Sequence, residues 1–138
     1  MPTFFATLSR HLAVVANAKW MSLYLRVLSG VLIYGATVHA GNMLGLTGKP
    51  WFSTPLLWRV MDVVLLVFDV VVSVGLWQRR VWAIAAFVFG IICLQILPYT
   101  LLRNAFIMSP ADAQTLNGLI GSELVLLGVL VGLIVSGK

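Results

Sequence analysis

Two aspartates interrupt an otherwise apolar stretch of the chain, at a spacing that places them on one side of a helix. The stretch runs from Arg59 to Trp77, reads RVMDVVLLVFDVVVSVGLW, and holds Asp62 and Asp69 seven residues apart. Residues separated by seven positions lie on nearly the same helix face. A carboxylate in an apolar environment is costly unless it is paired or solvated. We therefore expect both aspartates to mark one inward-facing surface, at two levels.

Other polar side chains fall near the level of Asp62 in the neighbouring apolar segments. Gln95 and Tyr99 are four residues apart, so they share a helix face. The candidate polar pocket comprises His39, Asp62, Gln95, Tyr99, Arg103 and Glu123. Carboxylates near a histidine are typical of a proton relay or a cation site, and structural hydrogen bonding between helices is the alternative. The spacing fits no metal-binding motif, so we assign neither a metal ligand nor a catalytic residue.

Asp69 has a different expected partner on the first apolar segment. Arg26 lies seven residues after Lys19, and Asp69 lies eight residues before Trp77. At a rise of about 1.5 Å per residue, the two charges sit ~10 Å and ~12 Å from the same boundary. Opposite charges at matching depth predict a structural ion pair between Arg26 and Asp69.

The elements that must position these residues are membrane-spanning helices. Of the 138 residues, 61% are hydrophobic and only 9% are charged, whereas soluble domains average about 25% charged residues. The nine Lys and Arg residues are scattered along the chain, which argues against nucleic-acid binding. The single Cys93 excludes an internal disulfide. We therefore expect an integral membrane protein embedded in the lipid bilayer.

Four segments reach the length of about 20 residues that a helix needs to cross the hydrocarbon. They cover residues 20–41, 56–77, 82–102 and 117–135. The predicted fold is therefore an all-α membrane protein, a four-transmembrane-helix bundle forming one domain over residues 1–138. Near the N-terminus, residues 1–18 are expected to form a short helix lying in the membrane interface. Its apolar residues recur at helical spacing: Phe4, Leu8, Leu12 and Val15.

The distribution of basic residues predicts the orientation. One side of the predicted bundle carries Arg10, Lys19, Arg79, Arg80 and Lys138, and the other carries Lys49, Arg59 and Arg103. Because the more basic side stays in the cytoplasm, both termini are expected to be cytoplasmic, with the bacterial inner membrane as the expected host.

Proline and glycine predict local features of the last two spans. Pro98 cannot bond the carbonyl near Leu94, so it is expected to bend its helix and open room beside Gln95. The last span holds a small-residue pattern that permits close helix packing, either inside the bundle or against another subunit. It consists of Gly121, Gly128 and Gly132.

Two stretches carry a resemblance to a known family. RVLSGVLIYGATVHAG, residues 26–41, has an arginine followed after three residues by glycine, and GLWQRRVWAIAA, residues 75–86, joins glycine, a basic turn and an alanine-rich helix. Over about 65 residues the chain resembles the DoxX-like four-helix membrane proteins. The resemblance matches Arg26 to an early arginine of that family. It also implies an accessory membrane subunit near quinone chemistry.

These observations leave two main hypotheses about function. The first is a non-catalytic accessory or anchoring subunit of a larger complex, which the resemblance would make a quinone-linked redox complex with quinone or lipid as ligand. Its partners would be other membrane subunits or further copies of the chain. The alternative is a small transporter or proton-conducting protein that uses Asp62, Glu123 and His39. An enzyme acting on lipid or quinone is a third hypothesis, although no soluble catalytic motif is present.

Overall fold

The computed structural model describes residues 3–138, and every regular element in this range is a helix. In chain order the elements are α1 (Phe4–Val15), α2 (Lys19–Met43), η1 (Trp51–Ser53), α3 (Leu56–Trp77), α4 (Val81–Gly90), η2 (Ile91–Ile96), α5 (Leu97–Leu101), α6 (Arg103–Phe106) and α7 (Pro110–Ser136). Because α4, η2 and α5 follow without a break, they form one rod, Val81–Leu101. Residues 1–2 of the predicted interfacial helix lie outside the described residues.

Four helical rods are long and apolar enough to cross a membrane, namely α2, α3, the rod Val81–Leu101 and α7. This confirms the all-helical prediction and the four apolar segments, and it indicates an integral membrane protein. The first three predicted spans end within two residues of the observed helices. The last helix starts at Pro110, earlier than predicted, because Ser109 and Asp112 form a capping box and Pro110 occupies its first turn.

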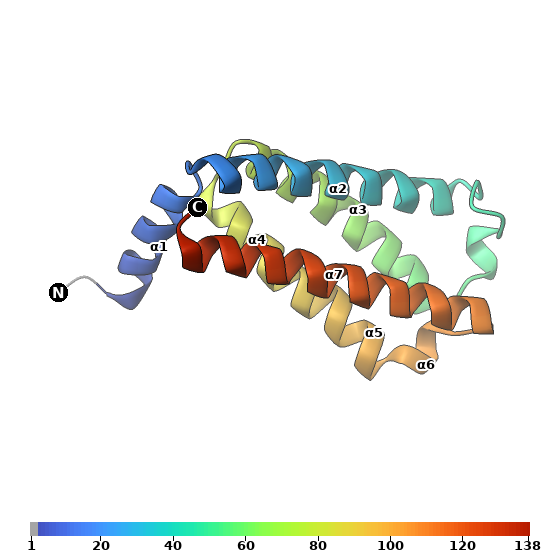
Figure 1. Ribbon diagram of the computed structural model, residues 1–138. Helices are drawn as coiled ribbons and strands as arrows, with labels where there is room; N and C mark the ends of the chain where they lie inside the picture. Colours follow the sequence, from blue (N-terminus) through green and yellow to red (C-terminus); the bar gives the residue numbers. More distant parts are fainter. Residues whose placement is uncertain (1–2) are drawn as a thin grey trace.

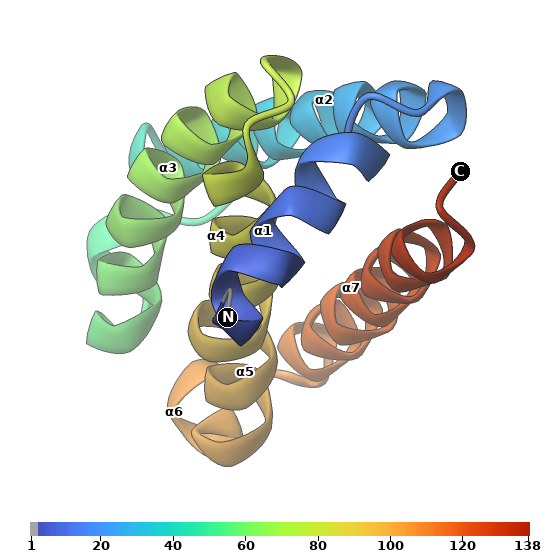
Figure 2. The same ribbon diagram turned by 90° about the vertical axis from the view of Figure 1, so that its left-hand side faces the viewer.

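The four rods lie alongside one another, with α1 set apart at one end (Figure 1). α2 packs along α3, α3 packs against α4, and α7 contacts α2 and η2. We call the end that holds α1 and the C-terminus the terminal end, and the opposite end, with η1 and α6, the loop end (Figure 1). Figure 2 shows α1 lying across the terminal end, where it contacts α4 and α7. His11 Nε2 of α1 lies 3.2 Å from the carbonyl oxygen of Ile134.

The apolar core consists of two clusters, one toward each end of the rods. The cluster toward the terminal end includes Met21, Leu25, Leu76, Phe87 and Leu130. The cluster toward the loop end consists of Met61, Leu65, Tyr99, Phe106 and Leu116. α2 and α3 are also joined by hydrogen bonds, since Ser29 Oγ donates to the carbonyl oxygen of Ser73 at 2.9 Å. Apolar packing thus joins the helices toward both ends.

The glycines of α7 face away from the rest of the chain. A Cβ atom added at Gly121, Gly128 or Gly132 would meet no atom within 4 Å. Of the two predicted roles for this pattern, close packing inside the bundle is therefore wrong. Packing against another subunit, the other predicted role, stays a prediction.

The third rod changes its helical form just before Pro98. Ile91–Ile96 is a π-helix, in which each turn is wider than an α-helical turn. Pro98 has no N–H to donate to the carbonyl of Leu94, and its ring would crowd that carbonyl in a regular α-helix. The predicted disturbance is thus taken up by a wide turn that contains Gln95. Such turns often occur at functional sites.

Candidate functional site

A cavity of about 520 Å³ lies in the loop-end half of the molecule, between the four rods. Most of its lining is apolar and comes from α2, α3, α4, η2, α5, α6 and α7. Its titratable side chains are Tyr34, His39, Asp62, Asp69, Tyr99 and Glu123. We call this space the central cavity. Its volume falls within the range of about 300–1,000 Å³ that is typical of small-molecule sites.

Asp62 has donors on both carboxylate oxygens. Oδ1 accepts from Asn42 Nδ2 at 3.0 Å and lies 2.8 Å from His39 Nδ1. Oδ2 accepts from Trp51 Nε1 at 2.9 Å. The Asp62 residue is only 2% exposed, so these three contacts replace the water that the carboxylate loses. Asp62 is therefore a fixed, satisfied group that holds His39 in one orientation.

Asn42 and Trp51 were not among the residues predicted from the sequence. Asn42 lies one residue before the C-terminal residue of α2, and Trp51 begins η1, in the loop that leads to α3. The loop folds back so that the Trp51 indole reaches Asp62, eleven residues later. A buried carboxylate needs nearby hydrogen-bond donors. This requirement is the one feature of the sequence that could have predicted donors for Asp62 in the adjoining loop.

Asp69 lies one level deeper on the same face of α3. Its Oδ2 is 3.8 Å from His39 Nε2, which is within ion-pair range but longer than a hydrogen bond. The same oxygen lies against the backbone of α2, since a Cβ atom added at Gly35 would be 2.6 Å from it. His39 therefore stands between two carboxylates, with Nδ1 toward Asp62 and Nε2 toward Asp69.

Glu123 reaches the central cavity from α7 on the opposite side. Its side chain is buried, with 5% of the residue exposed. Among the described residues its Oε2 has no hydrogen-bond partner. A buried acceptor without a donor is costly, so Glu123 Oε2 is a buried oxygen of the cavity that can receive a donor. Gln95 and Tyr99 line the same space from the third rod.

The structure brings five of the six predicted pocket residues around one cavity and leaves one outside. Arg103 lies on α6, where its Nη2 donates to Asn117 Oδ1 at 2.8 Å and to the carbonyl oxygen of Ala113 at 3.2 Å. Arg103 thus fastens α6 to α7. Asp69, which the sequence assigned to an ion pair elsewhere, lines the cavity in its place.

The predicted ion pair between Arg26 and Asp69 is wrong. Arg26 is exposed, and its guanidinium lies 5.5 Å from the centre of the Trp77 ring. Since Trp77 ends α3, the arginine extends toward the terminal end, as long basic side chains do near helix ends. The number of residues from the span ends gives the depth of a side chain in the membrane, but it does not give the direction in which the side chain points around the helix. Arg26 follows the buried Leu25 by one residue, which turns it about 100° away from the packed face.

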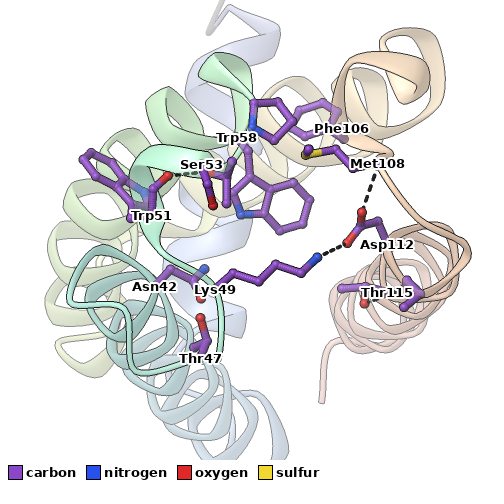
Figure 3. A pocket seen from close by; sticks show the side chains of 13 residues that line it. Asn42, Thr47, Lys49, Trp51, Ser53, Trp58, Phe106, Met108, Asp112 and Thr115 are labelled. Atoms are coloured by element: carbon purple, nitrogen blue, oxygen red, sulfur yellow. Dashed lines mark hydrogen bonds and ion pairs between the residues drawn. The ribbon is translucent and has the colours of Figure 1, made fainter.

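A second, outer pocket of about 400 Å³ lies at the loop end (Figure 3). Lys49 reaches across it, and its Nζ donates to Asp112 Oδ1 at 2.9 Å (Figure 3). The backbone N–H groups of Met108 and Ser109 donate to the other oxygen of Asp112. The outer pocket shares five lining residues with the central cavity, so the two spaces adjoin. The shared residues are Asn42, Thr47, Trp58, Phe106 and Thr115.

The central cavity is acidic. None of the nine Lys and Arg residues lines it, whereas Asp62, Asp69 and Glu123 do. Within residues 3–138, no three His, Cys, Asp or Glu side chains converge on a point where a metal ion could be held. Carboxyl groups and an imidazole around one cavity can bind or pass protons, or hold a cationic group.

Comparisons with protein-family models, with curated proteins and with solved structures give no match for this chain.

Proposed function

We propose that the chain is an integral membrane protein whose four long rods form a transmembrane bundle. Large apolar side chains point outward along all four rods, as lipid-facing residues do. α1 buries Leu12 and Val15 and exposes Phe4, Phe5 and Leu8, which suits a helix lying in the interface. The terminal end carries more basic residues than the loop end, which favours cytoplasmic termini in a bacterial inner membrane.

Within that bundle, the function that the geometry supports best is a small transporter or proton-conducting protein. The observation that carries it is the central cavity, where His39 joins two aspartates and Glu123 has an unpartnered oxygen. Intramembrane ionisable groups facing a cavity commonly mark ion or proton pathways. The cavity therefore favours this hypothesis over a purely structural role for the carboxylates.

The residues divide the work between holding and transferring. Trp51, Asn42 and His39 occupy both carboxylate oxygens of Asp62. Asp62 therefore holds the His39 imidazole in place and is not itself a proton carrier. The other imidazole nitrogen faces Asp69, and a proton can pass between them when their 3.8 Å separation shortens. Glu123 is a second carrier on the far wall. The outer pocket supplies the aqueous side, since it adjoins the cavity at the loop end.

Proton flux into liposomes tests this function. The purified chain is reconstituted in vesicles that contain a pH-sensitive dye, and a potassium diffusion potential drives protons inward. We expect flux with the wild type and loss of flux to the protein-free level with Glu123→Gln, which removes the charge and keeps the shape. Tyr24→Phe is the control, because Tyr24 does not line the cavity and the change removes only its hydrogen bond to the carbonyl oxygen of Leu126 in α7. Wild-type vesicles as tight as protein-free ones, with and without an added cation, would overturn the function.

A second candidate, the accessory or anchoring subunit of a quinone-linked complex, is favoured by a separate observation. The open glycine face of α7 leaves room for another helix to approach closely. The DoxX-like resemblance points the same way. Purification in mild detergent distinguishes the two, since stoichiometric recovery of other membrane subunits supports this candidate and recovery of the chain alone does not.

A further inference from the structure

We propose that the central cavity binds an organic cation with an apolar body, such as a protonated amine, and that Glu123 receives its positive group. This inference rests on the proposed function and names the class of ligand. It rests on four features of the cavity: its charge, its free acceptor, its lining and its opening.

The charge and the free acceptor select a cation. Three carboxylates line the space and no lysine or arginine does, so an anion would face repulsion in a low-dielectric environment. Asp62 is already saturated by donors. Glu123 is 5% exposed, and its Oε2 has no partner among residues 3–138. A ligand N–H or cationic centre beside this oxygen would satisfy it.

The lining selects an apolar body. Leu32, Met61, Leu65, Phe87 and Ile91 form much of the wall, and they offer no hydrogen-bonding group to a sugar or a phosphate. A volume of about 520 Å³ exceeds what a proton or a small hydrated ion needs and fits a compact molecule with several rings. The aromatic side chains of Trp58 and Tyr99 also line the space, and aromatic faces attract cations.

Exposed lining residues point to a sideways opening of the cavity between α2 and α7, where lipid would lie. Tyr34 and Val31 of α2 and Leu119 of α7 line the cavity, and they are 70%, 40% and 36% exposed. Tyr34 lies nine residues before the end of α2, which is ~14 Å along the helix axis and so within the hydrocarbon. A lipid-soluble cation could therefore enter from the membrane, while the outer pocket connects the same cavity to water at the loop end.

A pair of ions with the same shape and opposite charge tests the proposal. Binding of tetraphenylphosphonium and of tetraphenylborate to the purified full chain is measured by equilibrium dialysis against protein-free micelles. Quenching of tryptophan fluorescence gives a second readout, because Trp58 lines the cavity. We expect saturable binding of the phosphonium, no saturable binding of the borate, and roughly tenfold or greater weakening of phosphonium binding in Glu123→Gln. Tyr24→Phe should retain wild-type affinity.

Three results would overturn the inference. Equal binding of both ions would show an apolar space without charge selection, and unchanged phosphonium affinity in Glu123→Gln would remove Glu123 as the acceptor. If that variant does not fold, the comparison of the two ions on the wild type still decides. Proton flux in liposomes without phosphonium binding would sink this inference and leave the proposed function standing. Charge-selective phosphonium binding without flux of protons or of the cation would support this inference and overturn the proposed function.

Discussion

At the scale of single residues, the site depends on where each carboxylate finds a donor. Asp62 takes donors from three residues, Asp69 faces one imidazole nitrogen, and Glu123 has a free oxygen. The three groups are all carboxyl groups, but they have different freedom to exchange a proton or to bind a ligand. In purely structural hydrogen bonding between helices, each buried carboxyl group would have its donors. Here the number of donors differs from one carboxyl group to the next, as we expect of a site that transfers protons or binds a ligand.

Gly35 fixes the position of Asp69, and this can be tested by adding one methyl group. A Cβ atom at Gly35 would lie 2.6 Å from Asp69 Oδ2, so Gly35→Ala must push the carboxylate out of its place beside His39. We expect the variant to lose about 1–3 kcal/mol of stability, the usual cost of overpacking, together with proton flux. Thermal unfolding in detergent and the liposome assay measure the two effects.

Gly30→Ala is the matched control for this prediction. Gly30 lies on the same helix, and a Cβ atom there would meet nothing within 4 Å. Since alanine favours helix over glycine, this variant should keep its flux and gain slightly in stability. Equal behaviour of the two variants would show that Asp69 is not held against α2.

The level of each residue could be predicted from the sequence, and its direction could be predicted only in part. Counting residues from the span ends placed Asp62, Glu123 and His39 near one depth, because the helix rise is constant. The direction in which a side chain points around the helix axis depends on which face of the helix packs against its neighbours. Depth gives no information on this direction, so the partner predicted for Arg26 was wrong. The buried positions of α2, including Leu25, Leu28 and Leu32, follow helical spacing. That pattern was readable and would have placed Arg26 off the face and Gly35 and His39 near it.

At the scale of elements, the wide turn of the third rod is the irregular feature beside the site. Hydropathy predicts the rod because its apolar run is long, and proline predicts a disturbance, but the choice between a kink and a π-helix depends on packing that no local pattern shows. The wide turn Ile91–Ile96 keeps the rod continuous and carries Gln95 beside the cavity.

Replacing Pro98 should separate stability from function in this rod. Pro98→Ala restores an N–H group near the carbonyl of Leu94 and removes the ring that crowds it, so the segment can return to regular α-helix. We expect higher thermal stability, by up to about 3 kcal/mol, and lower flux, because Gln95 and the turn around it rotate away from their present places. Unfolding temperature and liposome flux are the measurements.

Pro110→Ala serves as the control for the proline effect. Pro110 occupies the first turn of α7, where its missing N–H costs nothing, so this variant should change neither quantity appreciably. A fall in the stability of Pro98→Ala, with flux intact, would mean that the wide turn is a packing requirement of the bundle rather than a feature of the site.

At the scale of the whole molecule, the two ends differ in charge and in closure. The terminal end is sealed by α1 and by an apolar cluster, whereas the loop end holds the outer pocket that adjoins the cavity. If the basic terminal end faces the cytoplasm, the aqueous entrance faces the opposite side of the membrane. Ligand or protons would then enter from outside the cytoplasm, or sideways from the lipid.

Cysteine labelling on intact cells decides this orientation. In a Cys93→Ala background, exposed serines are replaced one at a time by the nearly isosteric cysteine: Ser9 in α1, Ser136 at the end of α7, and Ser53 in η1. A membrane-impermeant maleimide should label Ser53→Cys on intact cells and should label the other two only after the membrane is permeabilised. Four spans require both termini on one side, so labelling of Ser9→Cys without Ser136→Cys would contradict the four-span arrangement. Labelling of both on intact cells, with Ser53→Cys protected, would keep the four spans and reverse the orientation, which places the aqueous entrance of the cavity in the cytoplasm.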